Sequence, residues 1–284
     1  MSEISETMDV LSRRDVHLLA LLERMVTTSG TAAGPTGTLF DLERIAELLE
    51  SDAPEIVFQP IVDLATGTAV GYEALSRFST APLRSPDLWF AQAARVGLGL
   101  ELELKAMRLA LAALDDIPAG AYLAVNVGAA TLGSPAIEAL IEGVRGDRVV
   151  LELTEHDPID DYESLGAAVE TLRDLGFRLA VDDAGAGCAG FNHILKVSPD
   201  IIKLDRGITR SIDLCPSRRD MAASLVALAR AVGAVVVAEG VETAAERDEL
   251  VRIGVTDGQG YLFSEPARRP WDPVPPLPND ERAG

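Results

Sequence analysis

Between Glu55 and Tyr261, short apolar segments alternate with longer segments of helical periodicity, and this alternation constrains the fold most strongly. Connections long enough to hold a helix typically join parallel strands. We expect strands at 55–64, 68–76, 122–127, 148–154, 178–183, 200–204, 235–239 and 255–261. The intervening helical patterns lie at 100–114, 134–144, 162–175, 219–232 and 244–253.

Eight strands with helical crossovers predict an α/β fold, a closed TIM-like (β/α)8 barrel. The first two strands are joined at Thr66-Gly67, and so short a connection makes an antiparallel hairpin. The first strand should therefore run antiparallel to the others. An open doubly wound sheet is the alternative, but the chain has no glycine-rich dinucleotide fingerprint to favour it.

Segments of different character flank the predicted barrel at residues 54–266. Residues 1–53 form a helical extension, with a loop at 29–38 and a short helix at 39–50. A seven-residue apolar repeat in this extension is typical of an amphipathic helix, which either packs on the main domain or forms an oligomer contact. Residues 267–284 form a proline-rich tail. The apolar repeat consists of Ile4, Leu11, Leu18 and Met25.

Acidic and amide side chains recur where the predicted strands end. Buried charges are costly unless a partner or a metal compensates them. In a (β/α)8 barrel, the loops after the strands build the active site. Several oxygen ligands at corresponding strand ends therefore indicate one site that collects divalent cations. These residues are Glu73, Asn126, Glu152, Asp182, Asp183 and Glu239.

Asp182 and Asp183 are adjacent, so a regular strand would point their side chains to opposite faces. Gly185 and Gly187 follow at once and permit a sharp turn, so both carboxylates could reach one pocket. Two metals about 3.5–4 Å apart are a recurring arrangement for phosphodiester hydrolysis. An isolated Asp-Asp pair is more often part of a solvated turn. Here the other acids at corresponding strand ends favour a metal site instead.

Lys203 is a cation inside an apolar strand, where it either stabilises phosphoryl charge or forms a structural salt bridge. Glu73, Leu75 and Arg77 alternate onto one face, which could hold a phosphate beside a cation or form a lining ion pair. Gln259, close to a strand end, could contact a base or a ligand water.

The charge and residue composition limit the ligands that the chain could bind and the compartment in which it could work. The net charge of −20 opposes binding of polynucleotides and anionic membranes. The all-oxygen ligand set suits Mg²⁺ or Mn²⁺, and the three histidines lack metal-motif spacing. Two cysteines are too few for a disulfide framework and fit a reducing cytoplasm. We find no signal peptide and no apolar stretch able to span a bilayer.

These residues, in this order, resemble the EAL family of cyclic di-GMP phosphodiesterases over about 55–266. The namesake motif reads Glu73-Ala74-Leu75-Ser76-Arg77 here. The resemblance implies hydrolysis of cyclic di-GMP to linear 5′-pGpG with two Mg²⁺ or Mn²⁺ ions per active site. It also implies a homodimer, and we expect Ca²⁺ to inhibit because its larger shell suits the site poorly.

The resemblance assigns a role to each candidate residue. One metal would be held by Glu73, Asn126, Glu152 and Asp182, and the other by Asp182, Asp183 and Glu239. Lys203 would lie beside the metal-activated water, with Asp182, Asp183 and Glu239 completing the catalytic set. Leu75 and Arg77 would contact the dinucleotide, and Gln259 would lie near the metal-bound water. Glu155 and Glu242 would anchor the loop that begins at Asp183.

The loop after Asp183 departs from the family pattern. Family members commonly carry Asp-Asp-Phe-Gly-Thr-Gly, where this chain has Asp-Asp-Ala-Gly-Ala-Gly at residues 182–187. Two other functions compete with an active phosphodiesterase. One is a cyclic di-GMP receptor that binds without cutting, and the other is a two-carboxylate barrel glycosidase. A glycosidase would explain a glutamate pair but not the converging oxygen ligands. Aromatic residues make up only 5% of the chain, which is few for a surface that stacks against sugars.

Overall fold

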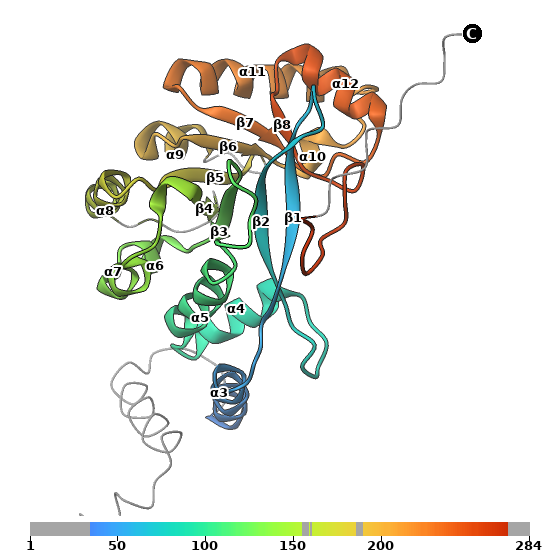
Figure 1. Cartoon of the computed structure of the whole chain (residues 1–284). Coiled ribbons are helices and arrows are strands. Elements are labelled where there is room, and N and C mark those ends of the chain that lie inside the picture. The colour runs from blue at the N-terminus through green and yellow to red at the C-terminus, as the bar shows by residue number, and fades with distance from the viewer. Residues whose placement is uncertain (1–34, 155–158, 160, 186–189, 272–284) are drawn as a thin grey trace, which may run out of the picture. The chain divides into compact units, whose positions relative to one another are not determined.

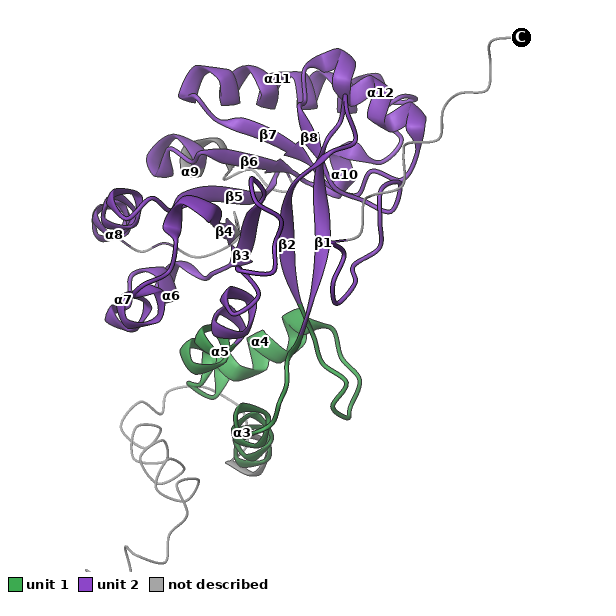
Figure 2. Ribbon diagram, in the orientation of Figure 1, with its two compact units in different colours: residues 1–55, 76–105 green, residues 56–75, 106–284 purple. Residues whose placement is uncertain are grey.

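The computed structural model describes residues 35–154, 159, 161–185 and 190–271. The chain divides into two compact units, shown in separate colours in Figure 2. The smaller unit combines residues 1–55 with 76–105, and the larger combines 56–75 with 106–284. The amphipathic helix predicted before residue 29 lies outside the described residues, as does the tail from residue 272.

The larger unit is built on a closed barrel whose eight strands follow one another around the ring in chain order (Figure 1). β1 pairs antiparallel with β8, whereas the neighbouring pairs from β2 to β8 are parallel. The predicted barrel and its antiparallel first strand are therefore confirmed. The strands are β1 (Glu55–Asp63), β2 (Ala69–Arg77), β3 (Tyr122–Asn126), β4 (Val149–Thr154), β5 (Arg178–Ala184), β6 (Ile201–Leu204), β7 (Val235–Ala238) and β8 (Asp257–Gly258).

Helices connect the strands, and α7, α8, α9, α11 and α12 lie outside the ring of strands (Figure 1). The helix predicted at 244–253 is α12, and Thr243 and Glu246 form the capping box that opens it. The short helices α6, α9 and α10 are not evident from the sequence, and β8 is shorter than the predicted strand. The helices of this unit are α6 (Ala129–Leu132), α7 (Pro135–Ile141), α8 (Tyr162–Asp174), α9 (Gly190–Val197), α10 (Arg206–Thr209), α11 (Pro216–Val232) and α12 (Ala244–Ile253), with a 3-10 turn at Gly146–Arg148.

Alternation of side chains along the strands produces two apolar layers. One set, which includes Leu123, Leu151 and Ile202, joins the large core formed with the helices. The residues between them form a separate small cluster of Ile61, Tyr122, Ala124, Val150, Ala180, Ile201 and Val237. Because this second set shares the opposite strand face, it fills the barrel interior, as expected for a (β/α)8 fold.

The smaller unit has its own core. It contains α3 (Pro35–Glu50), α4 (Pro86–Arg95) and the start of α5 (Gly99–Leu111). Leu42, Trp89 and Leu102 are among its fully buried side chains. α3 begins at Pro35, so the predicted loop at 29–38 extends too far. α4 is missed by the sequence patterns, although Ser85 followed by Pro86 at the first helical positions is a helix-start signal.

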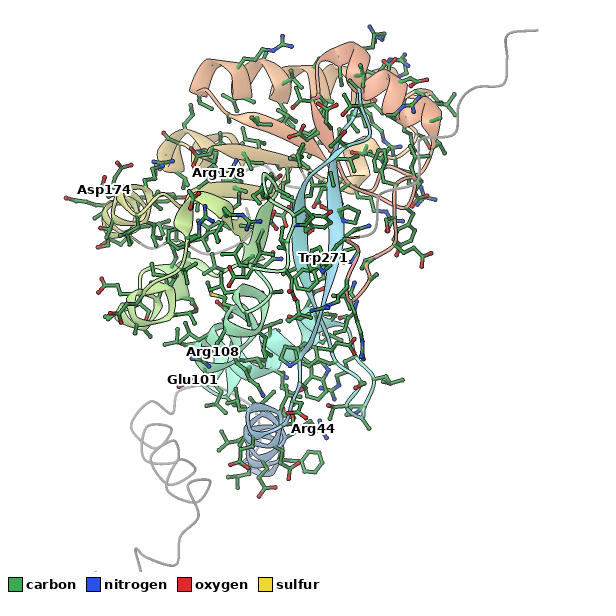
Figure 3. All side chains as sticks on the ribbon, viewed as in Figure 1. Arg44, Glu101, Arg108, Asp174, Arg178 and Trp271 are labelled. Atoms are coloured by element: carbon green, nitrogen blue, oxygen red, sulfur yellow. The ribbon has the colours of Figure 1, made fainter. Side chains whose placement is uncertain are left out.

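The segment after β8 packs on the larger unit. Phe58 in β1 and Ala267 form an antiparallel bridge, with N···O distances of 2.7 and 2.9 Å. The Trp271 ring lies 5.3 Å from that of Phe58 and 5.0 Å from that of Tyr72, the latter edge-on. Trp271 is labelled beside β1 and β2 in Figure 3. Among the helices of the described residues, none combines the length and apolarity needed to cross a bilayer.

Candidate active site

The candidate residues follow directly from the barrel's inner layer. Along each strand, the side chain two positions after an inward apolar residue faces the same interior. The pairs of residues related in this way are Ala124 and Asn126, Val150 and Glu152, Ala180 and Asp182, Ile201 and Lys203, and Val237 and Glu239. The carboxyl ends of these parallel strands meet at one edge, so a polar layer covers the apolar interior there.

Lys203 lies at the centre of this polar layer. Its side chain is 1% exposed, and its Nζ contacts carboxylates from four different strands or strand ends. The distances from Nζ are 2.8 Å to Glu239 Oε1, 3.0 Å to Glu152 Oε2, 3.2 Å to Asp182 Oδ1 and 3.5 Å to Glu73 Oε2. These contacts fit the structural salt bridge that the sequence offered as one of the two interpretations of Lys203.

The two adjacent aspartates reach the same site because β5 is irregular. The register between β5 and β6 shifts between Val181 and Ala184, and Asp183 has a φ of 56°. A β-bulge with one residue in the left-handed region turns that side chain away from its regular alternation. Aspartate tolerates this conformation better than most residues. The sequence suggested that the strand ends at Asp183, whereas the strand continues to Ala184 through the bulge.

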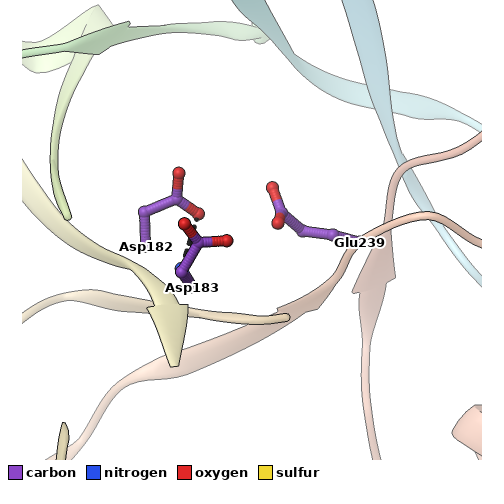
Figure 4. Close-up of side chains that lie close together, drawn as sticks. All are labelled: Asp182, Asp183 and Glu239. Atoms are coloured by element: carbon purple, nitrogen blue, oxygen red, sulfur yellow. Dashed lines mark hydrogen bonds between the residues drawn. The ribbon is translucent and has the colours of Figure 1, made fainter. Parts of the chain in front are cut away.

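Asp182, Asp183 and Glu239 form the group best arranged to hold a metal. Each offers a carboxylate oxygen, and these atoms lie within 4.8 Å of one another. Figure 4 shows Glu239 facing the two aspartates across the mouth of the barrel. The Asp183 backbone N–H also donates to Asp182 Oδ1 at 2.9 Å, which holds the two acids in place.

Glu73 is held by amides on both oxygens. Asn126 Nδ2 donates to Glu73 Oε1 at 3.1 Å, and Gln259 Nε2 donates to Glu73 Oε2 at 2.7 Å. Glu73 is 5% exposed, and Gln259 is 4% exposed. Residues from β2 and β3 and the residue that follows β8 therefore meet at one carboxylate.

The site carries more negative charge than Lys203 can balance. Burial raises the pKa of Glu239 to about 8, Lys203 opposes this, and the charges of Asp182 and Glu73 add to it. Burial also raises the pKa of Glu152 well above its usual value against the pull of Lys203. Burial alone would lower the pKa of Lys203, but the surrounding carboxylates hold it well above its usual value. An excess of carboxylates, with oxygen atoms as the donors, suits a divalent cation that prefers oxygen ligands.

The roles expected of the remaining candidates stay predictions. Leu75 is partly exposed on β2. Arg77 belongs to the smaller unit, where its Nη1 donates to its neighbour's carbonyl, Ser76 O. The Glu242 carboxylate accepts from Arg206 Nη2 at 3.3 Å. Glu155 lies outside the described residues, as does most of the loop that it was expected to anchor.

Sequence reasoning missed Gln59. This residue is 7% exposed in β1, and its Oε1 accepts a hydrogen bond from Gln259 Nε2 at 2.7 Å. The available signal was a polar amide inside the apolar segment Ile56–Val62, the same kind of signal that identified Lys203.

A family model described as the EAL domain matches residues 42–266, and the chain belongs to that family. A cyclic di-GMP phosphodiesterase of Pseudomonas aeruginosa is 33% identical over 226 residues, covering 74% of this chain and 38% of that protein. The chain therefore spans well under half the length of that curated relative.

The fold also matches solved structures. The manganese/cyclic di-GMP complex of Klebsiella pneumoniae BlrP1 at pH 9.0 is 32% identical with a TM-score of 0.67, covering 76% of this chain and 57% of that chain. Its calcium/cyclic di-GMP complex at pH 8.0 is 28% identical with a TM-score of 0.66, covering 87% of this chain and 71% of that chain.

Proposed function

We propose that this protein is a cyclic-guanylate-specific phosphodiesterase that hydrolyses cyclic di-GMP to linear 5′-pGpG and so lowers cyclic di-GMP signalling. The observation that carries the proposal is the Asp182, Asp183 and Glu239 triad beside the Lys203 cluster. Membership of the EAL domain family and similarity to a cyclic di-GMP phosphodiesterase support the choice of substrate.

The proposed ligand sets are those that the resemblance to the EAL family implies. One ion would take Glu73, Asn126, Glu152 and Asp182, and a second would take Asp182, Asp183 and Glu239. Bound Mg²⁺ or Mn²⁺ would supply positive charge and lower the pKa of a bound water. The oxygen-only donors and the raised pKa values of Glu152 and Glu239 support these assignments, because both features favour an added cation.

Lys203 supplies a fixed positive charge. The surrounding carboxylates raise its pKa, so the ammonium group keeps its proton at physiological pH. Its buried Nζ can donate a hydrogen bond to the attacking water or to a phosphoryl oxygen, which favours the charge that develops during attack. Asp182, Asp183 and Glu239 complete the catalytic set by accepting protons or ligating cations.

The remaining assignments concern the substrate and the assembly. Leu75 and Arg77 would contact the dinucleotide, Gln259 the bound water, and Glu155 and Glu242 the loop after Asp183. Ca²⁺ would inhibit because its flexible and larger coordination shell suits the site poorly. The seven-residue apolar repeat at the N-terminus supports a homodimer, and the low cysteine content supports a cytoplasmic location.

A turnover assay tests the proposal. Purified protein with Mn²⁺ or Mg²⁺ is incubated with cyclic di-GMP, and the products are separated by chromatography. We expect 5′-pGpG from the wild type and no measurable product from Glu73→Ala. Gln92→Met, which removes a buried amide in the smaller unit, should retain turnover. Tight binding of cyclic di-GMP with no linear product under either metal would instead identify a receptor.

A further inference from the structure

Two buried glutamines link the segment after β8 to Glu73. Gln59 Nε2 donates to the backbone carbonyl of Ser264 at 3.0 Å. Gln59 Oε1 then accepts from Gln259 Nε2 at 2.7 Å, and the same Nε2 donates to Glu73 Oε2 at 2.7 Å. The chain of hydrogen bonds therefore runs from a main-chain carbonyl to a proposed metal ligand.

The direction of each bond in this chain is fixed by chemistry. A carbonyl oxygen can only accept, so the amide nitrogen of Gln59 must face Ser264. This leaves the Gln59 oxygen facing Gln259, so the amide nitrogen of Gln259 must donate the hydrogen bond between them. A carboxylate also requires a donor, so Glu73 selects the same orientation of Gln259. The amide of Gln259 is thus oriented from two sides.

Among the described residues, this orientation leaves one acceptor without a partner. Within the described part of the chain, Gln259 Oε1 is buried and has no hydrogen-bond partner. A buried acceptor without a partner costs about 1–3 kcal/mol, so such a group calls for an explanation. An oxygen that faces a bound water or a cation would recover that cost.

We propose that Gln59 is a positioning residue, which acts through Gln259 to present Gln259 Oε1 to a water bound at the metal site. This inference rests on the proposed function. Gln59 itself does not touch the reacting atoms. Its role is to prevent the amide of Gln259 from rotating, which would place the oxygen of Gln259 against the carboxylate of Glu73.

The support for Gln59 is rigid. The adjacent residue, Phe58, forms both hydrogen bonds of the bridge to Ala267, so the backbone around Gln59 is tied to the segment that carries Ser264. On the other side, a Cβ on Gly260 would lie 2.2 Å from the carbonyl oxygen of Val241. Only glycine allows this close backbone approach beside Gln259. Both ends of the relay are therefore fixed by main-chain contacts.

Gln59→Met tests the proposal because it keeps the side-chain length and removes both amide groups. We expect Mn²⁺ affinity, measured by titration of the free protein, to fall about 10-fold, within the range for residues that orient metal ligands. The value of kcat should fall by a similar factor, and KM for cyclic di-GMP should change less than about twofold because Gln59 is not a substrate contact. If Gln59→Met does not fold, Gln59→Asn carries the test, since its amide is one methylene too short to span both partners.

A double-mutant cycle distinguishes positioning from packing. If Gln59 acts through Gln259, Gln59→Met should have almost no further effect on Mn²⁺ affinity in a Gln259→Met background. Gln92→Met is the matched control. Gln92 is also buried and bridges Arg84 and Asp41 in the smaller unit, so its loss should reduce stability without changing Mn²⁺ affinity.

Two results would overturn the proposal. One is a change in Mn²⁺ affinity below twofold in folded Gln59→Met. The other is a double variant whose loss of Mn²⁺ affinity equals the product of the fold-losses in Gln59→Met and Gln259→Met. Because Mn²⁺ affinity is measured without substrate, these results are separate from the proposed reaction. A wild-type protein that binds Mn²⁺ but leaves cyclic di-GMP intact would refute the reaction and leave the role of Gln59 standing.

Discussion

Replacing Lys203 with methionine should strongly destabilise the metal-free protein. The ammonium group lies 2.8–3.5 Å from four carboxylates and is almost fully buried. Removing one partner from a buried ion pair leaves uncompensated charge and costs about 3–5 kcal/mol. For a domain of this size, that loss corresponds to a fall in Tm of about 6–20 °C.

The loss should grow as the pH rises. Burial already raises the pKa of Glu239 to about 8 while Lys203 opposes the shift. Without Lys203 this pKa rises further, so the folded variant keeps a proton that the folded wild type loses as the pH rises through about 8. Stability then falls with increasing pH by about 1.4 kcal/mol per unit for each extra proton. The deficit should change little between pH 5.5 and pH 7 and should grow from about pH 8 to pH 9.

Urea unfolding of metal-free protein at several pH values between 5.5 and 9 measures this deficit. Lys105→Met is the control, because Lys105 Nζ donates to the carbonyls of Leu48 and Leu49 at 3.0 Å and also to that of Ser51. These partners are neutral, so the loss in this variant should not depend on their protonation. A Lys203→Met deficit below about 1 kcal/mol at pH 9, or one no larger at pH 9 than at pH 6, would refute the reasoning.

Three further perturbations test other parts of the structure. Burial and the charge of Asp63 raise the pKa of Asp257 to about 6, so its ionisation penalises folding in full above pH 6 and not below the unfolded value near 3.8. Asp257→Asn should therefore raise the free energy of unfolding by about 1 kcal/mol at pH 7.5, which is less than the full pKa shift would give because the group is partly solvated. At pH 4, urea titrations should show no gain in stability. Equal gains at both pH values would contradict this cause. Trp271→Ala should cost about 2 kcal/mol in thermal unfolding, since it removes a half-buried ring packed on Phe58 and Tyr72, and an unchanged Tm would argue against that packing. Excess Ca²⁺ should suppress turnover measured with Mn²⁺, and unchanged rates would count against the proposed ligand geometry.

The barrel was predictable because its strands carry two kinds of information. Apolar segments gave the strand positions, and the charged residues at their ends could be placed at one edge because parallel strands share a direction. The short connection at Thr66-Gly67 was sufficient to reverse the first strand. The meeting of Glu73, Asn126 and Gln259 follows from the same logic.

Other features depend on contacts that no local pattern contains. The bulge that turns Asp183 into the site reflects a register shift against β6, and periodicity cannot reveal it. Gln59 gains its meaning only from Ser264 and Gln259, which lie about 200 positions away. The packing of Trp271 follows a proline-rich stretch whose composition suggested only an extended tail.

The central claim is that the acids at the barrel mouth hold two divalent ions around the substrate. Crystals grown with Mn²⁺ and cyclic di-GMP, and measured at the manganese absorption edge, would locate the ions directly. The account predicts two anomalous peaks, one next to Glu73 and Glu152 and one next to Asp183 and Glu239, with Asp182 touching both. Absence of anomalous density among these side chains, or peaks elsewhere on the molecule, would contradict it.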